Sequence, residues 1–197
     1  MEEFSSIRKY VSKFLSFTEA EWQMHQSLLT LKWLKKGEFL LTAGQVCNHV
    51  SFINTGHFRV YNMVYDEERT SNFEFEGNYV TDYCSFLTRQ PSSDCIVAMD
   101  DAQVLQLSYE NMQSTFEKSP VWQKFGRLIA EHTFIKAELR AKSLLFKTPE
   151  ELYLELMKER PKVMERIPQH YIASYCGIKP ESLSRIRKRL SEKPVSK

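Results

Sequence analysis

The sequence predicts an α+β protein with an N-terminal antiparallel β-roll of the jelly-roll type, a long central dimerisation helix and a C-terminal helix-turn-helix domain. Three observations predict this order. Short β-rich runs separated by glycines fill residues 33–107, apolar residues recur at heptad spacing in 120–146, and basic and apolar residues interleave in 172–190. The expected boundaries are 1–118 for the roll with its lead-in, 119–147 for the long helix and 148–197 for the C-terminal domain.

The roll is predicted from six β-rich runs that follow an amphipathic helical lead-in, residues 4–31. The runs are FLLTA (39–43), HVSFINTG (49–56), HFRVYNMVY (57–65), TSNFEFEG (70–77), DCIVAM (94–99) and AQVLQLS (102–108). Gly37, Gly44, Gly56 and Gly77 punctuate them. Many short strands with glycine turns are typical of an antiparallel sandwich or roll.

The long helix is predicted from residues 120–146, which contain no proline after the first position. Apolar or near-apolar residues recur there in alternating steps of four and three, a pattern typical of a seam between two helices. These residues are Val121, Phe125, Leu128, His132, Ile135, Leu139, Lys142 and Phe146. We expect Phe125, Leu128, His132, Ile135 and Leu139 to contact a second copy of the chain. The alternative is an amphipathic helix that packs only on its own domain.

The C-terminal domain begins with Thr148, a suitable helix cap, followed by a proline at the first helical position. We expect helices at 149–160, from Pro168 to Tyr175 and from Pro180 onward, with Gly177 supplying the left-handed backbone of the turn. In the last helix, Leu183, Ile186 and Leu190 share one face. The opposite face carries Glu181, Ser184, Arg185 and Lys188, with Arg189 beside them and Arg187 nearer the buried edge.

The charge is unevenly distributed. Residues 160–197 hold ten Lys and Arg and three Glu, a net charge of +7, whereas the whole chain carries +2 and the remainder therefore −5. A basic end on an acidic body indicates that this end meets a polyanion. Arg can bond guanine bidentately, Glu can accept from cytosine, and Ser suits several bases. The polar helix face therefore suits a DNA major groove, with Lys188 and Arg189 on phosphates; the alternative is a solvated basic helix.

The segment RIPQHYIASYCGIKPESLSRIRKRL (166–190) resembles the DNA-binding end of the Crp/Fnr family of bacterial transcription factors. The resemblance implies that Glu181, Ser182 and Arg185 read bases, that Lys188 contacts the backbone, and that residues 168–170 lie near phosphates. The complete set of expected DNA-binding residues is Lys179, Glu181, Ser182, Ser184, Arg185, Lys188, Arg189, Gln169 and His170. Lys179 stands where the family often has a capping Ser or Thr, and Pro180 where some members place a DNA-contacting Arg.

The family resemblance further implies a homodimer on a palindromic double-stranded operator, with RNA polymerase as a partner. Seven residues follow Leu190, so we expect no β-wing after the recognition helix.

The segment KKGEFLLTAGQVCNHVSFINTGHFRVY (35–61) is similar to the family's cyclic-nucleotide-binding roll. In nucleotide-binding members a Gly-Glu pair and a downstream Arg-Ser or Arg-Thr pair hold the ribose and the cyclic phosphate. Thr81-Asp82 and Ser92-Ser93 stand in those places here, so the phosphate-binding arginine is missing. A buried phosphate needs a fixed cation. These two pairs and the loop between them, residues 81–93, form the phosphate-binding cassette. We therefore expect a degenerate cassette that does not respond to cAMP.

The expected pocket residues are Val80, Thr81, Asp82, Tyr83, Arg89, Ser92 and Ser93. Arg89 is included because it could reach in from the neighbouring loop and replace the missing cation. Two alternatives stay open: the roll binds a cyclic nucleotide or another ligand or cofactor, or it serves as a protein-docking or purely structural platform.

Catalytic, metal and redox functions are not favoured. The histidines His25, His49, His57, His132 and His170 form no H-x-H pair, so a cupin-like metalloenzyme is an unfavoured alternative. The cysteines Cys47, Cys84, Cys95 and Cys176 lack metal or cluster spacing. His132 or Cys47 could ligate haem, but each is a lone residue. We expect no enzyme, no metal and no iron–sulfur cluster.

The whole chain has the composition of a globular protein, with 42% hydrophobic and 26% charged residues. The N-terminus is charged and has no apolar signal region. No apolar run reaches the roughly 18 residues of a membrane span. We therefore expect a cytoplasmic protein without a membrane partner.

Overall fold

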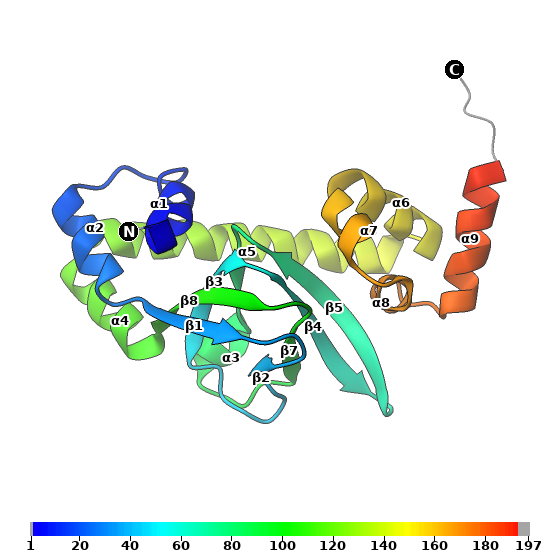
Figure 1. Ribbon diagram of the computed structural model, residues 1–197, viewed down its shortest axis with the longest axis horizontal. Coiled ribbons are helices and arrows are strands. Elements are labelled where there is room, and N and C mark those ends of the chain that lie inside the picture. Colours follow the sequence, from blue (N-terminus) through cyan, green and yellow to red (C-terminus); the bar gives the residue numbers. More distant parts are fainter. Residues whose placement is uncertain (1, 193–197) are drawn as a thin grey trace, which may run out of the picture.

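The computed structural model describes residues 2–192 (Figure 1). The N-terminal segment contains the 3-10 helix η1 (Glu2–Phe4) and the helices α1 (Ser5–Val11) and α2 (Glu19–Gln26). The roll contains β1 (Thr30–Leu34), β2 (Phe39–Leu41), β3 (His49–Thr55), β4 (His57–Val64), β5 (Glu67–Phe75), β6 (Tyr79–Val80), α3 (Tyr83–Thr88), β7 (Asp94–Ala98) and β8 (Ala102–Ser108). The helices α4 (Tyr109–Lys118), α5 (Pro120–Phe146), α6 (Pro149–Glu159), α7 (Pro161–Arg166), α8 (Gln169–Tyr175) and α9 (Pro180–Glu192) follow.

The N-terminal lead-in is helical, as expected for residues 4–31. It forms two separate helices, and its last residues belong to β1. The second helix begins at Thr18, which accepts a hydrogen bond from the Glu21 backbone while the Glu21 side chain accepts one from Thr18. This capping box starts α2 as a helix separate from α1, because it satisfies the orphan backbone donors there.

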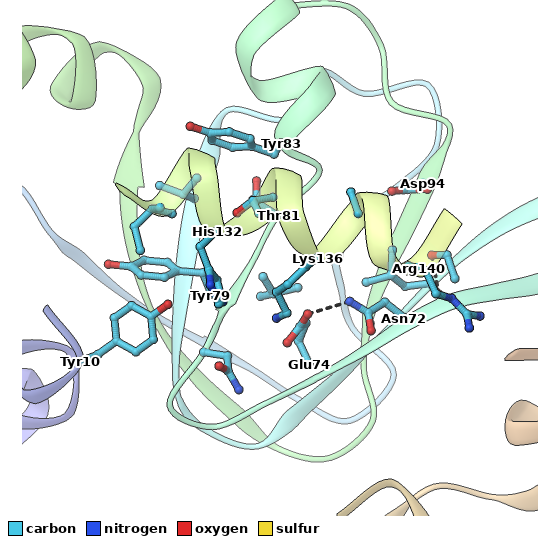
Figure 2. A pocket seen from close by; sticks show the side chains of 18 of the residues that line it. Tyr10, Asn72, Glu74, Tyr79, Thr81, Tyr83, Asp94, His132, Lys136 and Arg140 are labelled. Carbon is cyan, nitrogen blue, oxygen red and sulfur yellow. Dashed lines mark hydrogen bonds between the residues drawn. The ribbon is translucent and has the colours of Figure 1, made fainter. Parts of the chain in front are cut away.

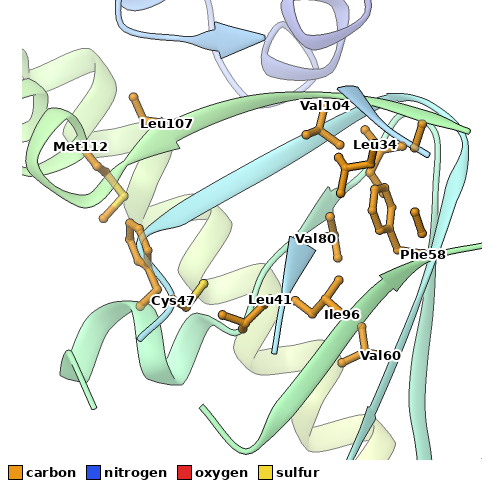
Figure 3. Packing of buried hydrophobic residues seen from close by; sticks show 14 residues of the cluster. Leu34, Leu41, Cys47, Phe58, Val60, Val80, Ile96, Val104, Leu107 and Met112 are labelled. Atoms are coloured by element: carbon orange, nitrogen blue, oxygen red, sulfur yellow. The ribbon is translucent and has the colours of Figure 1, made fainter. Parts of the chain in front are cut away.

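The roll consists of two four-stranded antiparallel sheets, in the orders β1-β8-β3-β6 and β2-β7-β4-β5. Their inner faces enclose a buried apolar cluster (Figure 3). Neighbouring residues point to opposite faces of a strand. On β3, Ile53 therefore lies in this cluster, whereas Phe52 packs on the other side with α1 and α5. The six expected strand runs all contain strands, and β1 and β6 are additional.

Position 56, in the β3–β4 turn, requires glycine. Its φ is +87°, and a Cβ there would lie 2.7 Å from the Cβ of Ala102. Both the left-handed backbone and the close approach exclude a larger residue. The turn itself therefore packs directly against the start of β8.

Helix α5 has the boundaries expected for the long helix and runs beside the roll to the C-terminal helices (Figure 1). Its first turns are part of the chain's own core. Phe125 is 7% exposed and packs edge-on against Trp122 and Phe14. It is therefore enclosed within its own chain, which corrects the expectation that it contacts a second copy. The exposed residues of the expected seam begin further along, at His132, and continue with Ile135 and Leu139.

The C-terminal helices follow the expected order, with α7 as an additional helix where we expected a connection. Thr148 and Glu151 form a capping box at the start of α6, and Gly177 has a φ of +72° between α8 and α9. Residues 193–197, on which the expectation of no β-wing depends, lie outside the described residues.

The expected boundary at residue 148 does not separate two hydrophobic cores. Phe73 and Phe75 of β5 lie in one buried cluster with Leu152, Ile172 and Leu183 of the C-terminal helices. Strands β4 and β5 are thus covered on their outer face by those helices. The C-terminal domain completes its core with two aromatic residues from the roll.

Candidate nucleic-acid interface and ligand cavity

The α8–α9 unit has the local geometry of a helix, a tight turn and a second helix. The backbone N–H of Ile178 donates to the carbonyl of Ala173 at 3.0 Å, and that of Gly177 to Ser174 at 3.0 Å. The backbone N–H groups of Ser182 and Leu183 donate to the carbonyl of Lys179, at 3.0 Å and 3.2 Å, and start α9. The turn therefore sets the direction of α9 relative to α8.

Helix α9 has one buried and one exposed face. Leu183 is 1% exposed, and Ile186 and Leu190 pack partly buried against the same cluster. The residues on the exposed face are Glu181, Ser184, Arg185 and Lys188, with Lys179 exposed before the helix and Ser182 half-buried. Arg187, which we expected nearer the buried edge, is exposed as well. In Figure 1, α9 stands at one end of the molecule, away from the sheets.

The charged groups of α9 differ in how firmly they are held. The Arg185 guanidinium donates to Ser182 Oγ at 3.2 Å, and Lys188 lies 3.9 Å from Glu192, so both stay at the surface. Arg189 instead forms an ion pair with Glu150 of α6. Its side chain therefore ties α9 to α6 in this structure and does not extend freely from the exposed face.

Gln169 and His170 lie at the start of α8, as expected. Gln169 is half-buried, and its side-chain oxygen has no hydrogen-bond partner among the described residues. His170 is exposed and lies against Tyr171, with 3.9 Å between ring centroids.

A second feature is a cavity of about 550 Å³ between the roll and α5 (Figure 2). One part of its wall is apolar and aromatic and includes Leu105, Met112, Phe116, Trp122, Phe125 and Ile129. The other part is polar and mostly charged, and it includes Asn72, Glu74, Lys136, Arg140, Glu159 and Arg160. Such a wall suits an organic molecule with an apolar body and a polar group.

The expected pocket residues divide into two groups. Val80, Thr81 and Tyr83 line this cavity. The others, Asp82, Arg89, Ser92 and Ser93, are not among its lining residues.

Asp82 and Ser92 are joined by a hydrogen bond between their side chains. Asp82 caps α3 by accepting from the backbone N–H of Ser85 at 3.0 Å, and it accepts from Ser92 Oγ at 2.6 Å. The neighbouring Asp94 lines the cavity, and burial together with the charge of Asp82 raises the pKa of its carboxyl group. This segment therefore holds two carboxyl groups and a hydroxyl close together.

Arg89 does not replace the missing cation in this structure. It ends α3 with a φ of +59°, and its guanidinium donates to the carbonyl groups of Cys47 at 2.9 Å and Phe86 at 3.1 Å. The same group lies 4.4 Å above the Tyr109 ring. These contacts hold Arg89 at the outer side of α3.

Glu74 is the central acidic group of the charged cavity wall. Burial raises the pKa of Glu74, while the charges of Lys136 and Arg160 and a hydrogen bond from Asn72 oppose that rise. Figure 2 shows Lys136 extending from α5 toward Glu74. Sequence reasoning missed these residues because they come from three separate elements: β5, α5 and the junction of α6 and α7. The alternation N-F-E-F over 72–75 was the available signal, since it places two polar side chains on one face.

Comparisons with known proteins agree with this architecture. Residues 31–119 match the family model described as cyclic nucleotide-binding domain. A search of curated proteins by sequence found no match.

Solved structures cover most of the chain. The catabolite activator protein of Thermus thermophilus is 19% identical, with a TM-score of 0.58 over 91% of this chain and 86% of that one. FixK2 of Bradyrhizobium japonicum is 16% identical, with a TM-score of 0.67 over 83% and 84%. A Eubacterium rectale protein assigned to the Crp/Fnr family is 16% identical, with a TM-score of 0.68 over 89% and 84%.

The fold is therefore that of Crp/Fnr regulators: a cyclic nucleotide-binding-type roll, a long helix and a C-terminal helical domain. The family resemblance read from the sequence is confirmed at this level. Among the described residues, no helix is both long and apolar enough to cross a bilayer, and no group of His, Cys, Asp and Glu is arranged to hold a metal ion.

Proposed function

We propose that this protein is a dimeric transcription regulator that binds a palindromic DNA operator through α9 and whose roll does not respond to cAMP. The exposed basic face of α9, set on a buried apolar face, is the observation that carries this proposal. It has no enzymatic activity, acts in the cytoplasm, and works with RNA polymerase, as the Crp/Fnr resemblance implies.

The chemistry of the exposed face supports major-groove recognition. Arg185 can form two hydrogen bonds with guanine, while Glu181 and Ser184 can bond cytosine or several bases. Lys179 and Lys188 suit phosphates, and a recognition helix of this kind enters the groove with its first turns. The ion pair of Arg189 with Glu150 supports a positioning role for Arg189 in addition to any phosphate contact.

The exposed face of α5 supports a dimer. Ile135 is 56% exposed and Leu139 is 59% exposed, one helical turn apart on the same face, and Leu128 extends that face toward the roll. Burying each such side chain stabilises an interface by about 1.5–3 kcal/mol. A two-fold dimer through α5 would place two copies of α9 in successive major grooves, about one helical turn of DNA apart.

The cassette geometry supports the lack of a cAMP response. The hydrogen bond between Ser92 and Asp82 occupies the arginine's place, and Asp94 adds a second carboxylate. Burying a phosphate beside these acids without a fixed cation would cost several kcal/mol.

A selection from a random duplex library at near-physiological salt tests the proposal. We expect wild-type protein to enrich a palindrome and added cAMP to leave its affinity unchanged. Arg185→Ala should lose the preference at one base pair of each half-site, a loss of about 1–3 kcal/mol in discrimination. Arg187→Ala, on the same helix but away from the reading face, is the matched control and should keep the motif. Enrichment of the same motif by Arg185→Ala would show that α9 does not read the sequence in this way.

A further inference from the structure

Strand β5 is a wall shared by the cavity and the DNA-binding domain. Asn72 and Glu74 line the cavity, whereas Phe73 and Phe75 are buried in the cluster formed by the C-terminal helices. The alternation of side chains along a strand puts these two pairs on opposite faces. A change at the cavity face of β5 is therefore separated from the C-terminal helices only by the thickness of this single strand.

The C-terminal domain is held to this strand by polar contacts as well as by the apolar cluster. Arg166 of α7 forms ion pairs with Glu76 at 2.8 Å and with Asp100 at 2.9 Å. Ser174 of α8 accepts a hydrogen bond from the backbone N–H of Thr70 at 2.9 Å and donates to the carbonyl of Glu68 at 3.0 Å. The Thr70 amide is thus bonded directly across the boundary, which makes it a local reporter of docking.

Asn72 connects the two sides through its amide group. Its Nδ2 donates to Glu74 Oε1 at 2.7 Å, on the cavity side (Figure 2). Its Oδ1 accepts from Nη1 of Arg160 at 2.9 Å, and Arg160 lies at the junction of α6 and α7. Arg160 also donates to the carbonyl of Phe73. One side chain therefore joins a cavity carboxylate to the DNA-binding domain.

We propose that Glu74, Asn72 and Arg160 form a relay by which an occupant of the cavity changes the docking of the DNA-binding domain, and that the occupant carries a hydrogen-bond donor directed at Glu74. A carboxylate only accepts hydrogen bonds, so a group that displaces Asn72 from it must donate, as an amine, an amide or a hydroxyl does. The apolar cavity wall accommodates the body of such a molecule. The effect on DNA rests on the proposed function.

The test removes the relay from the cavity side and measures docking without any ligand or DNA. We expect Glu74→Ala, which takes away the acceptor of Asn72, to speed hydrogen exchange at the Thr70 amide by about fivefold, as the loss of one net hydrogen bond would do. Glu74→Gln retains a side-chain acceptor and should restore slow exchange. In an Asn72→Ala background, adding Glu74→Ala should cause no further change, because the connection is already broken.

Lys136→Ala is the matched control, since it changes the charge next to Glu74 and leaves the relay intact; its Thr70 exchange should equal that of wild type. Circular dichroism would confirm that each variant is folded. Equal Thr70 exchange in wild type and Glu74→Ala would overturn the relay, and so would additive effects of the two substitutions. If the duplex selection yields no motif, the proposed DNA function fails. The exchange rate of the Thr70 amide still shows whether Glu74, Asn72 and Arg160 form a relay.

Discussion

At the scale of single residues, His25 combines complete burial with a lack of partners. The side chain is 3% exposed, and neither ring nitrogen has a hydrogen-bond partner among the described residues. Its ring stacks on Trp122 with 3.9 Å between centroids, and burial lowers the pKa of His25 to about 4. The imidazole therefore acts as an aromatic packing element, and its unpaired nitrogens cost free energy of folding.

His25→Phe should stabilise the fold by about 1–3 kcal/mol, because it removes buried polar atoms while keeping a ring on Trp122. The folded-state pKa lies below the ordinary value of 6.5, so the stability of wild type falls as the pH drops from about 6.5 toward 4. The variant should lack this part of the pH dependence. Chemical denaturation at several pH values measures both effects, with His170→Phe at the exposed position as control. A less stable His25→Phe protein would contradict the interpretation.

At the scale of elements, α5 serves two surfaces at once. Trp122, Phe125 and Ile129 face the roll and the cavity. Ile135 is exposed on another face, and Leu139 borders the cavity while remaining 59% exposed. The regular heptad in the sequence does not distinguish these roles, because both need apolar residues at the same spacing. Phe125 is consequently part of the core, whereas Ile135 and Leu139 remain available to a partner helix.

Ile135→Asp should convert the proposed dimer into monomers without unfolding the chain, since the side chain is 56% exposed in the single chain. A charge buried at a helix seam costs several kcal/mol unless it is paired. Ala141→Asp, which introduces the same charge on a different exposed face of α5, should remain dimeric. Sedimentation or light scattering reports the mass; a dimeric Ile135→Asp protein would show that this face is not the seam.

At the scale of the whole molecule, the roll and the C-terminal domain share a hydrophobic cluster and an ion-pair network. Glu76 is the meeting point of that network, in contact with Lys162 at 2.9 Å and Arg166 at 2.8 Å. Burial by itself would raise the pKa of Glu76, but the hydrogen bonds and charges of these two residues hold it at about 2. The two domains are therefore held together most firmly when Glu76 is ionised.

The docking contribution of Glu76 should be lost on acidification. Its folded-state pKa is depressed from the ordinary 4.5 to about 2, so the contribution is present above pH 4.5 and disappears as the pH falls toward 2. Glu76→Gln should show a shallower loss of stability than wild type across that interval. Comparing the two proteins by denaturation at each pH isolates this residue from the other carboxylates. Parallel curves would mean that Glu76 does not stabilise the docked arrangement.

Local signals in the sequence predicted much of the fold. The capping residue Thr148, Gly177 in its turn and Pro180 at a helix start act over a few neighbours, so the helices of the C-terminal domain could be placed in advance. The expected strand runs were correct for the same reason. The cavity residues were predicted only in part, because Val80, Thr81 and Tyr83 follow one strand, whereas Glu74 and Lys136 come from separate elements.

The sequence by itself determined the order of the parts, the boundaries of α5 and the separation of α9 into an apolar and a basic face, because periodicity and turn chemistry are local. The tertiary structure decided which distant residues meet. Arg160 reaches Asn72 across 88 positions, Arg189 pairs with Glu150, and Arg89 is held by backbone carbonyl groups outside the cavity. Such contacts depend on how strands pair and helices pack, and no short stretch of sequence contains that information.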